Sequence, residues 1–272
     1  MKEIDTFFEQ LWSQSCDLCP EVAKIDELLI GHGENKIIND HVAFRTLSGK
    51  KTGLAALTPA LTAMGYTVKA RYRFEEKKLN AVHLEHIDLG IQAPKIFISE
   101  LCLDELPPTV AAALEPVLTA IPSALIGTDK LFSAGRQWPV NWKTHKALAE
   151  ISEYAGWFYA FGYIANHFTV SINHLETFKS IESVNAFLEQ AGITLNSSGG
   201  KIKGSEAVHL KQSATLAFNT TVTGEQDGEP QPRQIPGIFR EMAQRFVLPS
   251  GERFEGFVEG NANTIFESTH QR

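Results

Sequence analysis

The chain has 272 residues, of which 43% are hydrophobic and 21% are charged, a composition typical of a globular protein. Its formal net charge is −7, its pI is about 5.7 and it contains no basic run, so nucleic-acid binding is disfavoured. The most apolar stretch, "WFYAFGYIA", is too short to span a membrane, and the acidic N-terminus lacks the layout of a signal peptide. We therefore expect a cytoplasmic protein that binds neither nucleic acid nor membranes.

Residues 1–34 are amphipathic and acidic, and this pattern predicts a helical arm. Within the arm, Cys16 and Cys19 form a lone C-x-x-C motif just before Pro20. A redox or zinc site would need a preceding strand or a second cysteine pair, and the sequence has neither. We therefore expect both thiols to pack on a helix that ends near Pro20, and Cys102 to be a core residue.

Two histidine motifs recur in the sequence with the same spacing. His41 lies in "DHVAFRTL" and His167 lies in "NHFTVSIN", 126 residues further on. His83 in "LNAVHLEH" and His209 in "SEAVHLKQ" are also 126 residues apart. This constant offset indicates an internal repeat.

Between these motifs, each copy contains an amphipathic helix that is followed by a glycine. The first helix is predicted within residues 52–67 and closes at Gly65, and the second is predicted within residues 176–194 and closes at Gly192. Each half of the sequence therefore predicts a strand, a helix and then further strands.

The repeat predicts an α+β fold in which two β-α-β-β-β modules form a curved mixed sheet around a metal site. We expect a single domain. Its predicted parts are a helical arm (1–34), a first module (35–102), a helical insertion (103–160) and a second module with a C-terminal loop (161–272).

The first strand of each module is predicted to have one apolar face and one face of polar or small residues. Alternate residues of a strand share a face. The polar or small faces carry His41, Ala43 and Arg45 in the first copy and His167, Thr169 and Ser171 in the second. His41 and His167 are therefore a plausible pair of metal ligands that face one concavity, and Ser171 is a weaker catalytic candidate.

A third ligand is expected from the last strand of the second module, where "PGIFREMAQRFVL" contains Glu241. The matching stretch of the first copy, "PKIFISEL", has Ile98 at that place. The segment around Glu241 also has helical spacing, and Glu255, Glu259 and Glu100 are competing carboxylates. Two histidines and one carboxylate form the ligand set of non-haem iron(II) oxygenases, which leaves coordination positions open.

Three further side chains have two interpretations each. Arg45 either binds the carboxylate of an acidic ligand or forms a structural ion pair with one of the 32 acidic residues. His83 and His209 are either additional ligands or paired strand histidines near the module interface, with His209 as a weaker catalytic candidate.

The sequence resembles the 2-oxoadipate dioxygenase/decarboxylase family, also called hydroxyglutarate synthases, of the vicinal oxygen chelate superfamily. The motifs that carry the resemblance are "DHVAFR", "NHFT", "LKQS" and "FREMAQR". The last motif is also similar to the "F-x-E-x-x-Q-R" of 4-hydroxyphenylpyruvate dioxygenase, whose glutamate binds iron. The resemblance extends from about residue 35 to the C-terminus and favours Glu241 as the third ligand.

The resemblance implies a role for each matching residue. His41, His167 and Glu241 would bind Fe(II), Arg45 would bind a substrate carboxylate, Gln212 would contact the substrate or a ligand, and Gly260 and Asn261 would belong to a C-terminal substrate loop. The implied reaction converts a 2-oxo acid and O2, with 2-oxoadipate as the expected substrate, into 2-hydroxyglutarate and CO2 in lysine catabolism.

Two alternatives remain at this stage. Zinc, nickel or manganese on the same ligands would support a lyase, an isomerase or a hydrolase. A small-molecule binding protein without a metal is the other alternative, in which His41, His167 and Glu241 would lie too far apart to share an ion. The sequence leaves the oligomeric state open.

Overall fold

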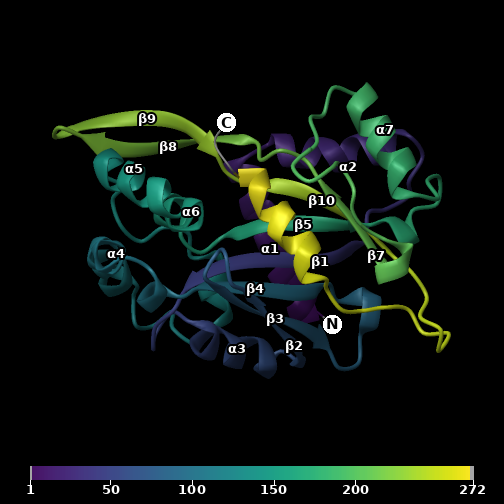
Figure 1. The fold of residues 1–272 in the computed structure, drawn as a ribbon, viewed down its shortest axis with the longest axis horizontal. Coiled ribbons are helices and arrows are strands. Elements are labelled where there is room, and N and C mark those ends of the chain that lie inside the picture. Colours follow the sequence, from purple (N-terminus) through teal and green to yellow (C-terminus); the bar gives the residue numbers. More distant parts are fainter. Residues whose placement is uncertain (1, 270–272) are drawn as a thin grey trace.

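The structure, a computed structural model, describes residues 2–269 and contains a mixed eight-stranded sheet (Figure 1). The strand order is β2-β3-β4-β1-β5-β10-β7-β6. The strands are β1 (Asn39–Leu47), β2 (Tyr66–Phe74), β3 (Leu79–His86), β4 (Lys95–Leu101), β5 (Ala165–Ser171), β6 (Lys203–Ser205), β7 (Leu210–Ala214) and β10 (Phe239–Arg245).

The sheet consists of two modules with the same topology, related by a pseudo-twofold between β1 and β5. In the first module β1 pairs parallel with β4, and in the second β5 pairs parallel with β10. The two leading strands are antiparallel neighbours at the centre of the sheet. The predicted α+β fold with repeated β-α-β-β-β modules is therefore confirmed.

Each module has one helix after its first strand, α3 (Leu54–Ala63) in the first and α7 (Ile181–Gln190) in the second. Both helices end just before the glycines that the sequence singles out. Gly65 has φ +89° and Gly192 has φ +83°, a left-handed conformation in which a side chain would be strained. The glycines therefore end the helices at the predicted places.

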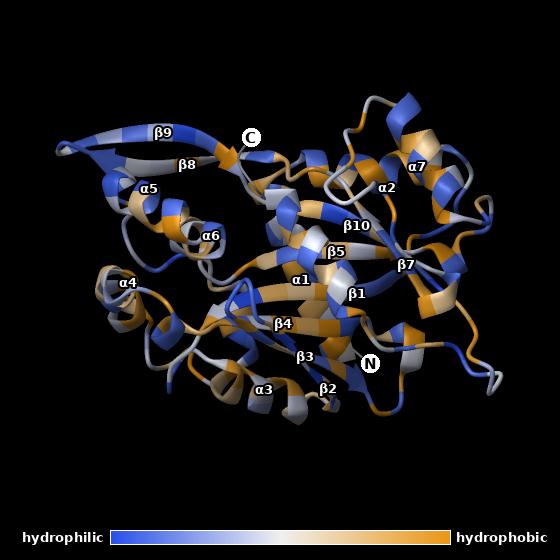
Figure 2. Cartoon of the chain, in the orientation of Figure 1, coloured by the Kyte–Doolittle hydropathy of each residue, from blue (hydrophilic) through white to orange (hydrophobic). Residues whose placement is uncertain are grey.

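The remaining elements surround this sheet. They are α1 (Lys2–Leu18), α2 (Glu21–Gly31), α4 (Pro108–Ala120), α5 (Trp142–Ile151), α6 (Glu153–Phe161) and α8 (Glu259–Ile265), the short 3-10 helices Gly90–Gln92, Leu103–Glu105, Asp129–Ser133, Ile172–His174, Glu206–Val208 and Phe266–Thr269, and the hairpin of β8 (Asn219–Gln226) and β9 (Glu229–Pro236). Figure 2 shows that this hairpin is mostly hydrophilic, unlike the central strands. In residues 2–269, no helix has both the length and the apolar character needed to cross a bilayer.

The apolar face of the sheet packs against the N-terminal helices. Trp12 of α1 lies edge-on to Phe168 of β5, with ring centroids 5.0 Å apart, and Val42 and Val170 are fully buried. On the opposite face, the C-terminal helix α8 crosses in front of β1, β5 and β10 (Figure 1). This helix contacts β2 of the first module and β6 and β7 of the second. It therefore covers the concave side of the sheet.

The strand register corrects one predicted equivalence between the modules. In the second module, Glu241 lies opposite Thr169. The equivalent of Thr169 in the first module is Ala43, and the residue opposite Ala43 is Phe97. The sequence predicts Ile98 at that position. Ile98 is one residue further along β4, and a strand points successive side chains to opposite faces.

The second histidine match is not a structural equivalence either. His83 lies on β3 opposite Phe97, and the residue opposite Glu241 on β7 is Ala214. His209 precedes β7 in a left-handed turn with φ +59°. The interpretation of His83 and His209 as paired strand histidines is therefore wrong, and the repeated "AVHL" does not mark equivalent positions in the two modules.

Candidate metal centre

His41, His167 and Glu241 meet on the concave face, one from each of the neighbouring strands β1, β5 and β10. Their ligand atoms all lie within 4.8 Å of one another, and the three side chains are buried. Oε2 of Glu241 is 3.1 Å from Nε2 of His167, and Oε1 is 3.6 Å from Nε2 of His41. Among residues 2–269, no other cluster of three or more histidine, cysteine or acidic side chains has this geometry.

The residue before each histidine fixes the orientation of the imidazole. Nδ1 of His41 is 2.8 Å from Oδ1 of Asp40, and Nδ1 of His167 is 3.1 Å from Oδ1 of Asn166. Since these oxygens accept the Nδ1 proton, the Nε2 lone pairs are directed at the centre. The sequence contains a signal for these partners, because "DH" and "NH" recur at the same offset as the histidines.

Asp40 is itself held by Arg245, which donates from Nε to Oδ2 (2.7 Å) and from Nη2 to Oδ1 (2.9 Å). Burial opposes ionisation of Asp40, but Arg245 and His41 outweigh it and hold the pKa of this carboxyl far below its ordinary range. Nη1 of Arg245 donates to the carbonyl oxygen of Gly256 (2.7 Å). The ring of the next residue, Phe257, lies 4.8 Å from that of His41. Arg245 therefore ties a wall of the site to its ligand shell.

Glu241 lies on a strand, which settles the helix alternative. Gln212 donates from Nε2 to Oε1 of Glu241 (2.6 Å), and Asn261 of α8 donates to Oε1 of Gln212 (3.0 Å). Burial raises the pKa of Glu241, but His41, His167 and Gln212 outweigh it and the net shift is downward. Burial lowers the pKa of His167 despite the nearby Glu241 carboxylate. A neutral imidazole and an ionised carboxylate are the states in which these groups bind metal.

The competing carboxylates lie elsewhere and have other partners. Glu255 pairs with Lys95 at 2.6 Å. Glu259 accepts a hydrogen bond from the backbone N–H of Arg73, and Glu100 accepts one from the backbone N–H at the start of α3. None of the three belongs to the His41–His167–Glu241 group.

Arg45 lies on the same side of β1 as His41 and is 1% exposed. Its Nη1 donates to Oε1 of Glu153 (3.0 Å) and its Nη2 donates to Oγ1 of Thr269 (2.7 Å). Its Nε is buried and has no hydrogen-bond partner among the residues that the structure describes. The structural ion pair is therefore present, and the Nε–H of the guanidinium is still available to a ligand.

A cavity of about 30 Å³, with room for only one or two water molecules, joins Arg45 to the three-residue group. Its lining includes Gln212 and Asn166 and is otherwise largely apolar. The apolar part of the wall consists of Ala43, Phe44, Phe97, Phe257, Ala262, Ile265 and Phe266.

The other predicted site residues lie outside this cavity. Gly260 is exposed on α8, and Asn261 is buried behind Gln212. The hydroxyl group of Ser171 is 2.8 Å from Nδ1 of His174, outside the ligand group. His209 occupies its left-handed turn.

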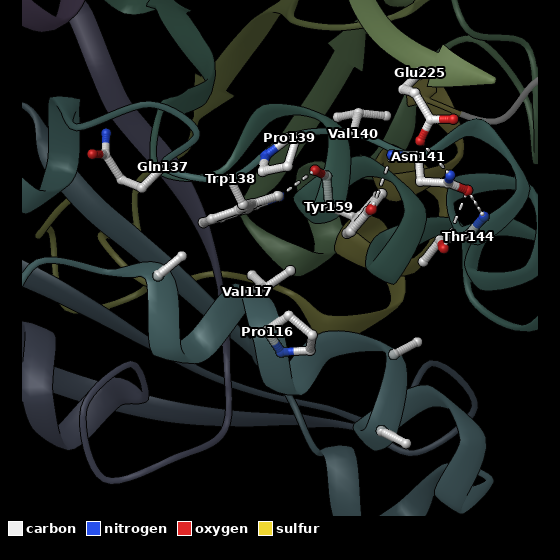
Figure 3. A pocket seen from close by; sticks show the side chains of 13 residues that line it. Pro116, Val117, Gln137, Trp138, Pro139, Val140, Asn141, Thr144, Tyr159 and Glu225 are labelled. Atoms are coloured by element: carbon white, nitrogen blue, oxygen red, sulfur yellow. Dashed lines mark hydrogen bonds between the residues drawn. The ribbon is translucent and has the colours of Figure 1, made fainter. Parts of the chain in front are cut away.

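A larger cavity of about 440 Å³ lies in the helical insertion (Figure 3). Its polar side chains bond to one another: Asn141 donates to Glu225 (2.9 Å), and the hydroxyl of Tyr159 accepts from the backbone N–H of Asn141 (3.1 Å). None of its lining residues lines the cavity beside the His41–His167–Glu241 group. Size alone therefore does not identify the chemical site.

Comparison with known proteins identifies the family. The sequence profile of the 2-oxoadipate dioxygenase/decarboxylase family matches residues 27–121 and 128–254. The chain belongs to this family. It is 33% identical to the 2-oxoadipate dioxygenase/decarboxylase of Oryza sativa subsp. japonica, a match that covers 92% of this chain and 74% of the rice protein.

Two solved structures share this fold. The hydroxyglutarate synthase of Oryza sativa, crystallised with 2-oxoadipate, has a TM-score of 0.87 and 32% identity, covering 99% of this chain and 94% of that one. A protein of Shewanella frigidimarina NCIMB 400, provisionally described as a hydrolase, has the same TM-score and 42% identity, covering 94% and 98%. The family resemblance and the enzyme class expected from the sequence are therefore confirmed.

Proposed function

We propose that this member of the 2-oxoadipate dioxygenase/decarboxylase family converts 2-oxoadipate and O2 into 2-hydroxyglutarate and CO2. The observation that carries the proposal is the buried group of His41, His167 and Glu241, whose ligand atoms are close enough to share one ion. The similarity to the rice enzyme crystallised with 2-oxoadipate supports the choice of substrate.

The donor set favours iron(II). Two imidazole nitrogens and one carboxylate on three adjacent strands match the ligand type of non-haem iron oxygenases, which leaves coordination positions open. His41, His167 and Glu241 would hold the metal, and Asp40 and Asn166 would orient the imidazoles. When bound, iron(II) supplies activation of O2 and polarisation of the 2-oxo group.

Arg45 would bind the terminal carboxylate of the substrate. The other two buried arginines serve as a comparison: Arg240 uses Nε and Nη2 to bind both oxygens of Asp26, and Arg245 binds Asp40 in the same way. Among residues 2–269, no carboxylate binds the Nε–Nη2 edge of Arg45, although this side chain is equally buried. A guanidinium edge of this kind matches a carboxylate in charge and shape.

The apolar wall would exclude water during the reaction. Phe257, Ile265 and Phe266 close the cavity from the C-terminal side, and the present volume is too small for a six-carbon acid. Substrate entry would require part of this wall to move outward, and α8 carries two of its residues, Ala262 and Ile265. Because Asn261 of this helix holds Gln212, and Gln212 holds Glu241, a shift of α8 would act on the ligand shell.

The test is anaerobic reconstitution with Fe(II), followed by O2 uptake and CO2 release with 2-oxoadipate. We expect iron-dependent turnover that is lost in His41→Ala and Glu241→Ala and retained in Glu255→Ala, a matched carboxylate outside the group. Parallel reconstitution with zinc, nickel and manganese tests the other metals. A protein that binds iron but consumes no O2 with any 2-oxo acid would contradict the dioxygenase assignment.

A further inference from the structure

The guanidinium of Arg45 is fixed by parts of the chain that are remote from β1. Glu153 is the first residue of α6 in the helical insertion, and Thr269 is the last described residue of the C-terminal 3-10 helix. The rings of Tyr154 and Trp157 lie 4.8 Å from the Cζ of Arg45. These contacts leave the guanidinium little freedom to rotate.

Glu153 and Thr269 accept hydrogen bonds from different nitrogens of this guanidinium. Glu153 takes Nη1, at the end of the fork away from Nε, while the neutral hydroxyl of Thr269 takes Nη2. Glu153 is 19% exposed, whereas Arg45 is 1% exposed, so the carboxylate is on the solvent side of the pair. The buried cation is thereby paired before any substrate arrives, and its Nε has no partner within residues 2–269.

We propose that Glu153 is a positioning residue that determines selectivity for dicarboxylic 2-oxo acids. By holding Nη1, it keeps the Nε–Nη2 edge of Arg45 presented to the terminal carboxylate. This inference rests on the proposed function, because it assumes that Arg45 receives that carboxylate. It adds that a residue of the helical insertion, which does not touch the substrate itself, sets which acids bind.

Loss of Glu153 should act only on substrates that use Arg45. Without its acceptor, Nη1 would be left unpaired in a buried environment, and the guanidinium would turn toward other acceptors. A terminal carboxylate would then lose its aligned pair of donors. A monocarboxylic 2-oxo acid of equal chain length makes no use of that edge and should bind as before.

The experiment measures the dissociation constants of 2-oxoadipate and 2-oxohexanoate by calorimetry on the Fe(II)-loaded protein without O2, and then their kcat and KM with O2. For Glu153→Ala we expect 2-oxoadipate affinity to fall by about tenfold or more, as for other supporting residues around a binding group. The affinity for 2-oxohexanoate should stay the same. Glu153→Gln, whose amide oxygen still accepts from Nη1, should retain most of the preference.

A matched control is Glu105→Ala, which removes a carboxylate from the more exposed ion pair with Arg73 and should change neither affinity. Equal losses for both acids, no loss for either, or tighter binding of 2-oxoadipate in Glu153→Ala would each overturn the inference. A wild-type protein that binds 2-oxoadipate selectively but consumes no O2 would contradict the proposed function while leaving the role of Glu153 intact.

Discussion

The two modules have the same topology but contribute different chemistry to the shared cavity. Each begins with a strand that supplies one histidine, His41 or His167, and each histidine is oriented by the residue before it. The modules differ in the strand that pairs in parallel with the leading strand, which is β4 in the first module and β10 in the second. At equivalent register the second module has Glu241, whereas the first has Phe97.

In a second difference, the first module supplies the charged side chain and the second does not. Arg45 of the first module corresponds to Ser171 of the second, four residues after each histidine. Arg45 lines the cavity, while Ser171 bonds to His174 outside it. The first module therefore supplies the cation and Phe97, whereas the second supplies the anionic ligand. A pseudo-symmetric backbone builds an asymmetric site because single positions on equivalent strands have diverged.

Substitution of Glu241 and of its structural equivalent Phe97 should give the largest difference in metal binding. Glu241→Ala should weaken metal binding by more than the 10- to 100-fold that is typical for loss of a supporting residue, and turnover should be abolished. Phe97→Ala should retain the metal. Metal content after dialysis, measured by elemental analysis, checks both variants, and equal metal loss in the two would contradict the assignment of Glu241 as a ligand.

The residues before the two histidines should differ in their effect on stability. Asp40 also pairs with Arg245, so Asp40→Ala leaves a buried cation unpaired and should cost about 3–5 kcal/mol of unfolding free energy. Urea denaturation of the metal-free protein measures this cost. The interpretation fails if Asn166→Ala, which breaks no buried ion pair, is equally destabilising.

Asn166→Ala should instead act on the metal. Loss of the acceptor at Nδ1 of His167 frees the ring to rotate, and metal affinity should fall by about 10- to 100-fold. Competition with a chelator measures the affinity. Asn166→Asp restores an acceptor at this position and should recover most of it; an affinity unchanged in Asn166→Ala would show that the hydrogen bond does not orient the ligand.

The smallest expected effect concerns Glu34, which joins the N-terminal arm to the second module. Its buried carboxylate accepts hydrogen bonds from the backbone N–H groups of Glu176 (2.7 Å) and Thr177 (2.8 Å). Glu34→Gln should cost about 1–3 kcal/mol at pH 7. Burial raises the pKa of Glu34, but the hydrogen bonds, led by that from Thr177, outweigh it and lower the pKa overall.

This pKa shift gives the contribution of Glu34 a definite pH dependence. Because the folded pKa is below the unfolded one, the carboxylate stabilises the protein above the unfolded value of about 4.3 and less as the pH falls below it. The difference in urea midpoint between wild type and Glu34→Gln should therefore narrow in acid. A constant difference from pH 7 to pH 3 would contradict this assignment.

Much of this architecture can be predicted from the sequence, because the signals for it are local. An offset of 126 residues between His41 and His167 indicates the repeat, and the alternation around each histidine indicates which face is polar. Gly65 and Gly192 mark the helix ends because a left-handed backbone favours glycine. These signals depend on short stretches of chain and do not require knowledge of how the stretches pack.

Other features were decided only by the tertiary structure. The identical "AVHL" letters around His83 and His209 adopt different conformations, because strand register, not sequence spacing, sets equivalence. Glu241 could not be separated from Glu255 by periodicity, since only the pairing of β10 with β5 brings a carboxylate to the histidines. The contact of Arg45 with Glu153 joins residues 108 positions apart. Local propensity carries no information about such contacts, because they form only when remote elements meet across a packed core.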